Sequence, residues 1–266
     1  MNLLFAVEKG YLNPLKVCLR SILRFPENGG YQIYILHSDL TKAEEEAFQQ
    51  LFEQNEVTFH FIEINPDVFA AFPESDRYPK QIYYRIFAAS FLPKELDRIL
   101  YLDADTLVIN SLHELYEMNF EGNYFLACTH VQEFLSKVNR IRLSISQPVP
   151  YINTGVMLMN LEAFREIQNI KEVLEYVNKK KDILLLPDQD IITALYGEQI
   201  KLLPSEIYNL SDRILAFHNA NVRNTKIDVD WVRENTVILH YCGRRKPWHK
   251  NYTGTLGTFY TEMLST

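Results

Sequence analysis

Cysteine is scarce in this chain of 266 residues. The three cysteines, Cys18, Cys128 and Cys242, have no metal-ligand spacing, and any disulfide pairing would leave one of them over. The sequence therefore indicates no disulfide framework, and a reducing cytoplasm is the expected location.

Long hydrophobic runs are also missing. No stretch approaches the ~20 apolar residues that a membrane-spanning helix requires. Residues 1–8 are too short and too soon acidic to serve as a signal peptide. We therefore expect a soluble, cytoplasmic protein without a transmembrane segment, and peripheral contact with the inner membrane face is left open.

Positive charge is in deficit. The chain has 27 Lys and Arg against 34 Asp and Glu, a formal net charge of -7, which argues against nonspecific binding of nucleic acid. A hydrophobic fraction of 47% is ordinary for a globular protein. Because the sequence also lacks internal repeats and linker-like tracts, we predict one domain over residues 1–266.

Glycine is sparse, and no Gly-x-Gly-x-x-Gly fingerprint of a classical dinucleotide site occurs. What is present is an alternating pattern. Apolar strands are predicted at residues 3–7, 31–36 and 58–64, and helices at residues 11–24 and 42–53 between them. This β-α-β-α-β order predicts an α/β fold with a mostly parallel, helix-covered sheet, whose ligands bind at the carboxyl ends of the strands.

Later segments continue the pattern less regularly. We predict helices at residues 81–91 and 161–180, a strand at 151–160 interrupted by Asn-Thr-Gly, and an extended segment at 201–208. Residues 130–150 are polar and contain two prolines, so they are interpreted as a lid or an acceptor-side insertion.

Two carboxylates follow a predicted buried strand at residues 98–102. Asp103 and Asp105 are one residue apart, so both can point to one place if the strand continues. Two close carboxylates repel each other unless a cation lies between them, and oxygen ligands suit magnesium or manganese. The alternative is that these carboxylates only cap a loop or helix.

A second polar group follows the last predicted strand, residues 237–240. His240 ends that strand, and Gly243 and Lys246 follow within a basic cluster that includes Arg244 and Arg245. Lys and Arg bind phosphate groups. Carboxylates, an imidazole and a diphosphate would together form a mixed oxygen and nitrogen site, which suits manganese.

Other polar residues have two interpretations. Arg85 either forms a surface ion pair or contacts an anion or a sugar. Asp188 and Asp190 either cap the helix that follows them or, with Gln189, point into a pocket.

The order of these motifs resembles glycosyltransferase family 8, the retaining GT-A-fold family that includes bacterial lipopolysaccharide galactosyl- and glucosyltransferases and glycogenin. The resemblance rests on six segments in order: 5–11 (FAVEKGY), 84–85 (YR), 100–106 (LYLDADT, with the DxD motif), 151–156 (YINTGV), 187–190 (PDQD) and 240–248 (HYCGRRKPW). Relatives commonly carry Asp where Glu8 stands.

The resemblance implies a single-domain GT-A (Rossmann-like) fold and a hexosyltransferase that uses UDP-glucose or UDP-galactose and a saccharide or glycolipid acceptor. Residues 1–105 would bind the nucleotide, and residues 106–266 would complete the metal, diphosphate, sugar and acceptor sites. Mn²⁺ or Mg²⁺ would be held by Asp103, Asp105 and His240. The donor would be bound by the nucleotide contacts Ala6, Glu8, Tyr11, Ala104 and Asp105, the diphosphate contacts Gly243 and Lys246, and the sugar contacts Arg85, Asn153, Asp188 and Gln189.

The same resemblance implies retention of configuration at the transferred sugar, with Gln189, Asp190 and Asp188 as candidate catalytic residues. Asp190 is the carboxylate considered for a covalent step, and Asp188 is expected to bind sugar hydroxyls. Because the Gln189 amide is a poor nucleophile that can still stabilise positive charge, attack on the same face of the sugar is favoured.

Two other functions compete with this prediction. A haloacid-dehalogenase-like phosphatase would use Asp103 as nucleophile and Asp105 as acid and base, although its nucleophile loop normally lies near the N-terminus. A non-catalytic nucleotide-sugar-binding protein would keep the donor site alone. Self-glycosylation on a tyrosine, as in glycogenin, is an alternative within the family.

Overall fold

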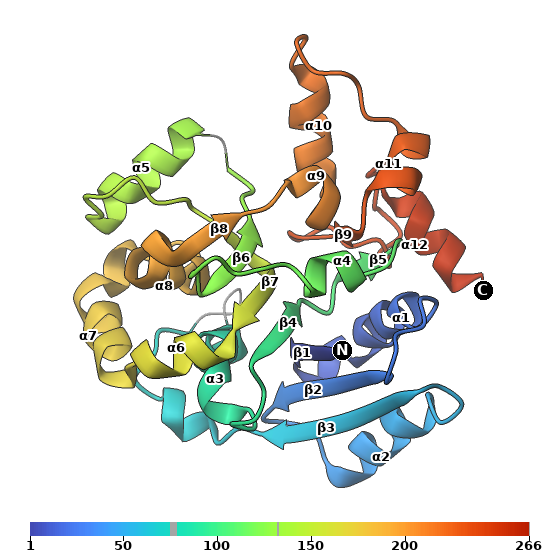
Figure 1. The fold of residues 1–266 in the computed structure, drawn as a ribbon, viewed down its shortest axis with the longest axis horizontal. Helices are drawn as coiled ribbons and strands as arrows, with labels where there is room; N and C mark the ends of the chain where they lie inside the picture. Colours follow the sequence, from blue (N-terminus) through green and yellow to red (C-terminus); the bar gives the residue numbers. More distant parts are fainter. Residues whose placement is uncertain (75–78, 132, 266) are drawn as a thin grey trace.

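The structure is a computed structural model that describes residues 1–74, 79–131 and 133–265. Within these residues a seven-stranded sheet has the order β3-β2-β1-β4-β7-β6-β8, and β5 and β9 form a separate two-stranded ribbon (Figure 1). The strands are β1 (Asn2–Ala6), β2 (Tyr31–His37), β3 (Val57–Glu63), β4 (Arg98–Leu102), β5 (Thr106–Val108), β6 (Phe125–Cys128), β7 (Asn153–Asn160), β8 (Ile200–Leu202) and β9 (Ile238–His240).

Helices surround the sheet (Figure 1). They are α1 (Leu12–Ile22), α2 (Lys42–Gln50), α3 (Ala88–Phe91), α4 (His113–Tyr116), α5 (Glu133–Leu143), α6 (Leu161–Ile167), α7 (Ile170–Lys180), α8 (Pro187–Tyr196), α9 (Ser205–Tyr208), α10 (Asp212–Ala220), α11 (Val229–Asn235) and α12 (Gly257–Leu264). Short 3-10 helices precede or follow several of them, at Lys9–Tyr11, Pro66–Phe69, Lys80–Phe87, Lys181–Ile183 and Gly197–Gln199.

The strand directions confirm the predicted α/β class with a mostly parallel, mixed sheet. Strands β3, β2, β1 and β4 are parallel, β6 is parallel to β8, and β7 is antiparallel to both β4 and β6. The reversal at β7 matters for function, because it places the start of β7 beside the carboxyl end of β4.

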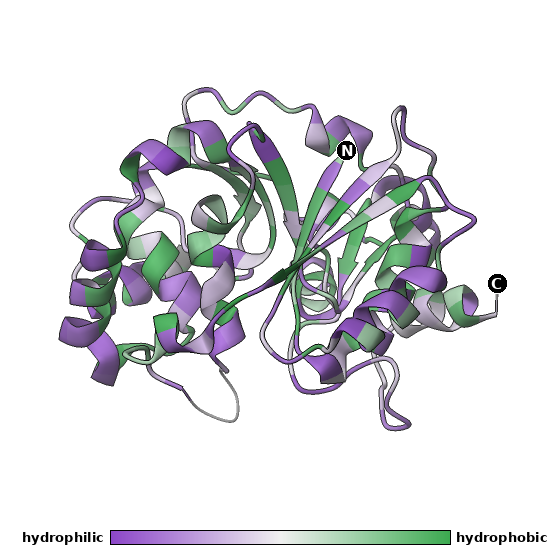
Figure 2. Cartoon of the chain, turned by 90° about the horizontal axis from the view of Figure 1, so that it is seen from below, coloured by the Kyte–Doolittle hydropathy of each residue, from purple (hydrophilic) through white to green (hydrophobic). Residues whose placement is uncertain are grey.

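Alternate residues of each central strand enter the two cores on opposite faces of the sheet, as the period of two requires. In β4, Ile99 and Tyr101 pack with α3, α6, α7 and α8, whereas Leu100 and Leu102 pack with α1, α2 and α4. Figure 2 shows the result: hydrophobic residues concentrate in the central strands, and hydrophilic residues concentrate on the outer helices.

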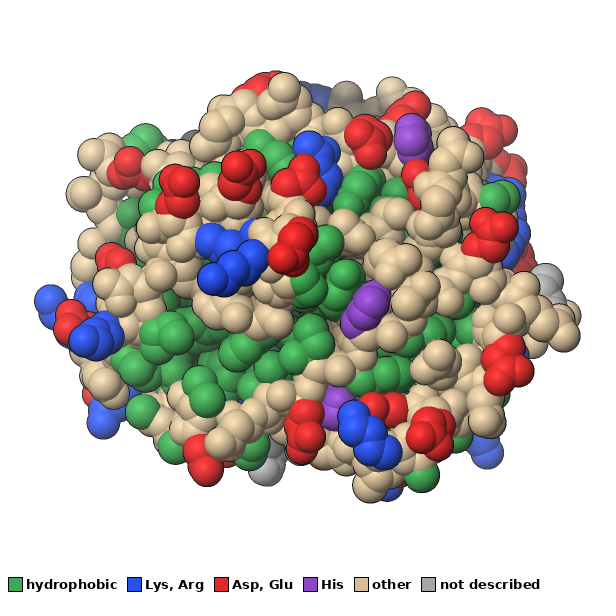
Figure 3. All heavy atoms as spheres, turned by 60° about the horizontal axis from the view of Figure 1, so that its bottom comes forward, with side chains coloured by type: hydrophobic (Ala, Val, Ile, Leu, Met, Phe, Trp, Pro, Cys, Tyr) green, Lys and Arg blue, Asp and Glu red, His purple; other side chains and the backbone are tan. Residues whose placement is uncertain are grey.

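Strand β3 is an edge of the sheet, and its side chains are only partly buried. The face in Figure 3, which brings the bottom of Figure 1 forward, carries hydrophobic side chains across its middle with charged groups around them. Three β3 residues, Phe59, Phe61 and Ile62, are half-buried hydrophobic residues that pack against the two main cores.

Several sequence-based boundaries were wrong. The helix predicted over residues 161–180 is two helices, because the Asn169 side chain caps α7 by accepting from the Lys171 N–H at 3.0 Å. The segment 81–91 is mostly 3-10 helix. The extended segment 201–208 ends at Leu202, since Pro204 precedes α9. The polar segment 130–150 contains α5.

In the part of the chain that the structure describes, none of the helices combines the length and apolar character that crossing a membrane would require.

Candidate functional site

Two strand pairings bring distant residues together at the carboxyl end of β4. The antiparallel register of β4 with β7 continues past Leu102, so that the Asp103 N–H donates to the Gly155 carbonyl at 2.8 Å. The β5 and β9 register places Thr106 opposite His240. A turn at residues 104–105 replaces the continuous strand considered from sequence, and it links these two pairings.

The two pairings create a three-residue donor set. The His240 Nε2 atom lies 3.3 Å from Asp105 Oδ1 and 3.7 Å from Asp103 Oδ2. One ligand atom from each of the three residues lies within 4.8 Å of the others. Two carboxylate oxygens and one imidazole nitrogen form a mixed set that suits manganese or magnesium, so the residues present fit the metal that the sequence implies.

The remaining oxygen of each carboxylate already has cationic or hydroxyl partners. Asp103 Oδ1 accepts from Arg85 at 2.9 Å and from the Tyr101 hydroxyl at 2.7 Å. Asp105 Oδ2 accepts from the Lys246 ammonium. Each carboxylate is therefore held at one oxygen, and its other oxygen faces His240.

Charge balance keeps this buried group ionised. Burial alone would raise the pKa of Asp105, but His240 and Lys246 lower it well below its usual range. Burial opposes charge on Arg85 as well, and the neighbouring Asp103 raises the pKa of this guanidinium. Asp105 therefore stays a carboxylate, which is the form that binds a metal.

Gly155 makes the close approach possible. A Cβ atom built on Gly155 would lie 2.6 Å from Asp103 Oδ2 and 3.0 Å from His240 Nε2. Real Cβ contacts are essentially never shorter than 3.0 Å, so the contact with Asp103 would force a side chain here to displace the donor set. The glycine in the Asn-Thr-Gly interruption is therefore explained by close packing of side chains against the backbone.

Two adjoining pockets flank the donor set. The first is lined by residues of β1, the turn after it and the DxD turn, including Ala6, Glu8, Tyr11, Arg85, Asp103, Ala104 and Asp105. Burial raises the pKa of Glu8, with a further contribution from Asp39. The nucleotide contacts predicted from the sequence are among these residues, and the structure brings them together.

The second pocket, of about 670 Å³, contains the other expected donor contacts. Its lining includes Tyr11, Arg85, Asp103, Asp105, Asn153, Asp188, Gln189, His240, Gly243 and Lys246. Arg85 lies 3.3 Å from Asp188, and the Thr154 hydroxyl donates to Asp188 at 2.6 Å. Burial raises the pKa of Asp188.

Sequence reasoning missed the partners that hold these residues. Thr154 and Tyr101 were inside recognised segments, but nothing in their spacing indicated contact with Asp188 or Asp103. Tyr101 was expected only as part of a buried strand; its position two residues before Asp103 puts its hydroxyl on that carboxylate.

Asp190 lies apart from this group. Its side chain is fully buried. It is not among the described residues that line the two pockets. Arg142 donates to both carboxylate oxygens at 2.7 and 2.8 Å, and the Tyr151 hydroxyl donates at 2.7 Å. The backbone N–H groups of Leu185 and Leu186 add donations at 2.7 and 3.2 Å. This environment holds the start of α8, and thereby Asp188 and Gln189, in place.

Changing Asp190 to Asn should therefore destabilise the protein. Asp190 is fully buried but Arg142 is partly exposed, so the loss is about 1–3 kcal/mol, which corresponds to a fall in Tm of roughly 2–12 °C for a chain of this size. Thermal unfolding measures this loss. A variant with the wild-type Tm but no turnover would instead indicate a direct catalytic role.

This chain is similar to known proteins over almost its whole length. The family model described as glycosyl transferase family 8 matches residues 2–252. Lipopolysaccharide 1,2-glucosyltransferase of Escherichia coli is 26% identical over 253 residues, 93% of this chain and 73% of that protein. The galactosyltransferase LgtC, solved with donor and acceptor sugar analogues, is 27% identical with a TM-score of 0.83, covering 100% of this chain and 95% of LgtC. A second LgtC structure, described as an active-site mutant in which a glutamine becomes glutamate, is 25% identical with a TM-score of 0.84, covering 100% and 95%.

The family match spans far more than half of the chain, and the resemblance inferred from the six motifs is confirmed. The chain therefore belongs to glycosyl transferase family 8, and it is a glycosyltransferase.

Proposed function

We propose that this protein is a metal-dependent, retaining transferase that moves glucose or galactose from a UDP-sugar to a saccharide or glycolipid acceptor. The observation that carries the proposal is the convergence of Asp103, Asp105 and His240 between two pockets lined by the expected donor contacts. Nucleotide would occupy the first pocket, built mainly from residues 1–105, and the hexose would occupy the second.

The acceptor class is inferred from the relatives. One is a lipopolysaccharide glucosyltransferase, and LgtC is a galactosyltransferase. A role in lipopolysaccharide biosynthesis, with a sugar-terminated glycolipid as acceptor, is the simplest common assignment. Both hexoses remain candidate donors, since the relatives differ in the sugar that they transfer.

The residues on either side of the donor set have complementary roles. Lys246, which is buried, would contact the diphosphate, and Gly243, whose φ of +102° favours glycine, would let the backbone approach it. A bound Mn²⁺ or Mg²⁺ would supply further positive charge to the leaving diphosphate. Charge that develops on the leaving group is thus stabilised by groups already in place.

On the sugar side, Asp188 and Arg85 would orient hydroxyl groups, since Asp188 is fixed by Arg85 and Thr154. Gln189 lines the same pocket, and its amide oxygen would stabilise positive charge at the anomeric carbon. In LgtC a glutamine-to-glutamate change is described as an active-site mutation, which supports a place for Gln189 in the active site. Asp190 is enclosed by Arg142 and Tyr151, so we favour attack on the same face of the sugar over a covalent step at Asp190.

A product assay tests the proposal. The protein is incubated with Mn²⁺, UDP-glucose or UDP-galactose, and a sugar-terminated lipopolysaccharide core oligosaccharide, and the new linkage is analysed by NMR. The expected product is an α-linked hexose from the α-linked donor, formed with Mn²⁺ and not with EDTA. Inversion to a β-linkage, or transfer that is unaffected by EDTA, would overturn the mechanism.

The phosphatase alternative predicts a different outcome. It requires hydrolysis of simple phosphate esters by Asp103, whereas here Asp103 Oδ1 is occupied by Arg85 and Tyr101. Membership of family 8 also argues against it. Incubation with a chromogenic phosphate ester and Mg²⁺ distinguishes the two activities directly.

Changing Lys246 to Ala should weaken UDP binding by roughly tenfold or more. The reason is the loss of a charge-assisted hydrogen bond to phosphate, worth about 1.5–3 kcal/mol. Isothermal titration with UDP in the presence of Mn²⁺ measures the effect. Lys250→Ala is the matched control, because Lys250 is exposed nearby. Equal affinities in the two variants would remove Lys246 from the site.

A further inference from the structure

Asn209 lies beneath the donor set and is fully buried, in the segment between α9 and α10. Its side chain joins two residues of the site: Asn209 Oδ1 is 2.9 Å from His240 Nδ1, and Asn209 Nδ2 donates to Asn153 Oδ1 at 3.0 Å. No motif in the sequence marks this residue.

The backbone N–H of Gly155 fixes the direction of both hydrogen bonds. The backbone N–H of Gly155, which can only donate, is 3.2 Å from Asn153 Oδ1, so Asn153 presents its carbonyl oxygen here. Asn209 must therefore turn its NH₂ group toward Asn153 and its Oδ1 toward His240. His240 therefore carries a proton on Nδ1, which leaves Nε2, the nitrogen beside Asp103 and Asp105, as the one that would bind a metal.

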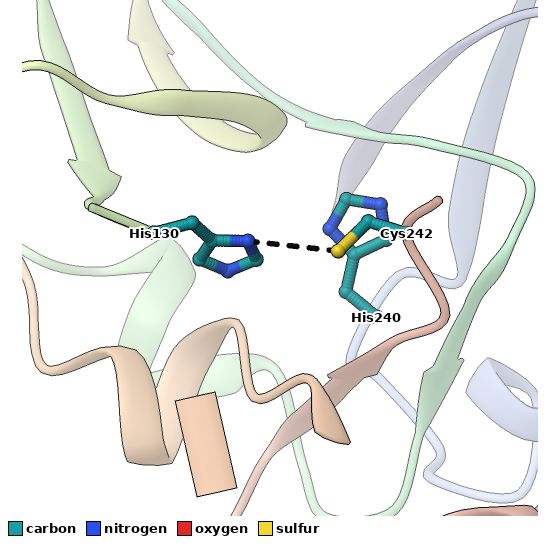
Figure 4. A group of neighbouring side chains, drawn as sticks. All are labelled: His130, His240 and Cys242. Carbon is teal, nitrogen blue, oxygen red and sulfur yellow. Dashed lines mark hydrogen bonds between the residues drawn. The ribbon is translucent and has the colours of Figure 1, made fainter. Parts of the chain in front are cut away.

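The backbone of Asn209 is anchored as well. His130 Nε2 lies 2.8 Å from the Asn209 carbonyl oxygen, and His130 Nδ1 lies 3.7 Å from the Cys242 sulfur (Figure 4). His130, His240 and Cys242 are residue types that bind metals, and their ligand atoms lie within 4.8 Å of one another. Both nitrogens of His130 and the Nδ1 of His240 nevertheless have hydrogen-bonding partners, so the group serves to fix Asn209 and His240.

We propose that Asn209 is a positioning residue that sets the tautomer of His240 for metal binding and, through the same amide, orients Asn153 in the sugar pocket. This inference rests on the proposed function, because it assigns His240 to the metal. Residues that orient a metal-bound histidine typically change metal affinity by about 10–100-fold when they are removed.

Two variants separate the two halves of the amide. Asn209→Leu removes both contacts, so Mn²⁺ affinity should fall by about 10–100-fold and the KM for the donor should rise. Asn209→Asp keeps an acceptor for His240 Nδ1 but cannot donate to Asn153. Its Mn²⁺ affinity should stay within about threefold of wild type, which is small beside the loss of about 10–100-fold expected for Asn209→Leu. Its KM for the UDP-sugar should rise.

Mn²⁺ affinity is measured by electron paramagnetic resonance of the free ion, without turnover. ¹⁵N NMR of the metal-free protein adds a direct readout: the wild type should show a proton on His240 Nδ1, and Asn209→Leu should show a loss of protonation at this nitrogen. If Asn209→Leu does not fold, Asn209→Asp still tests the split between metal affinity and KM.

The outcomes test the proposed function and the role of Asn209 separately. Wild-type protein that does not bind Mn²⁺ at all contradicts the proposed function. Wild-type protein that binds Mn²⁺, together with Asn209→Leu of unchanged affinity and an unchanged His240 tautomer, contradicts the role of Asn209 alone. Equal loss of Mn²⁺ affinity in Asn209→Leu and Asn209→Asp also contradicts it, because the retained acceptor should have preserved the metal site.

Discussion

Changing Asp103 to Ala should abolish metal-dependent turnover, with a fall in kcat of about 10²–10³-fold or more, the loss that follows removal of one preorganised electrostatic group. Asp103 Oδ2 is one of the three atoms that face each other in the donor set. Without it, two of the three residues of the donor set, Asp105 and His240, are left to hold the metal.

The fold should survive this change. Asp103 is at the surface of the pocket, with a quarter of its side chain exposed, and Arg85 keeps a carboxylate partner in Asp188 at 3.3 Å. Turnover and Mn²⁺ binding are compared with those of Asp182→Ala, a change at an exposed aspartate. Normal activity in Asp103→Ala would contradict the assignment of Asp103 as a metal ligand.

Changing Gly155 to Ala should lower Mn²⁺ affinity by about 10–100-fold, although it alters no ligand. The added methyl carbon would lie 2.6 Å from Asp103 Oδ2 and 3.0 Å from His240 Nε2, so these two ligands must move apart from each other or from the strand. Gly155 has no left-handed φ, which means that the backbone itself tolerates alanine.

The control for Gly155→Ala is stability in the absence of metal. Circular dichroism should show an unchanged fold, and electron paramagnetic resonance should show weaker Mn²⁺ binding. Wild-type affinity for Mn²⁺ in this variant would mean that the donor set does not have the geometry described here.

Much of the site was predictable because its signals are local. Asp103 and Asp105 follow a buried strand, and His240 and Lys246 follow another, so each pair was visible in a short window of sequence. The order of six such segments then indicated the family, and the fold followed from it. The strand pattern of the N-terminal half was equally local.

The supporting residues could not be predicted, because their roles depend on non-local register. Gly155 reaches Asp103 only through the antiparallel pairing of β7 with β4, and Asn209 reaches His240 through a segment without a motif. Asp190 shows the limit of local reasoning from the other side. It stands two residues from Asp188, yet on α8 it points into a buried cluster with Arg142, away from the pocket.

Some helix boundaries were predicted wrongly for a related reason. Periodicity alone cannot show that Asn169 caps a new helix, nor that Pro204 starts one, when the apolar spacing on both sides is compatible with continuation. The segment before Pro150 was polar in sequence, and its helix α5 is held to α8 partly through Arg142.

Thermal unfolding with UDP, with Mn²⁺, with both, and with both plus excess EDTA tests the central claim most directly. A ligand at ~100 times its dissociation constant stabilises the folded state by about 2.7 kcal/mol. A metal-dependent donor site predicts a rise in Tm with UDP and Mn²⁺ together that exceeds the sum of the separate shifts and disappears with EDTA. A shift with UDP that is the same with and without Mn²⁺, or no shift under any of these conditions, would contradict it.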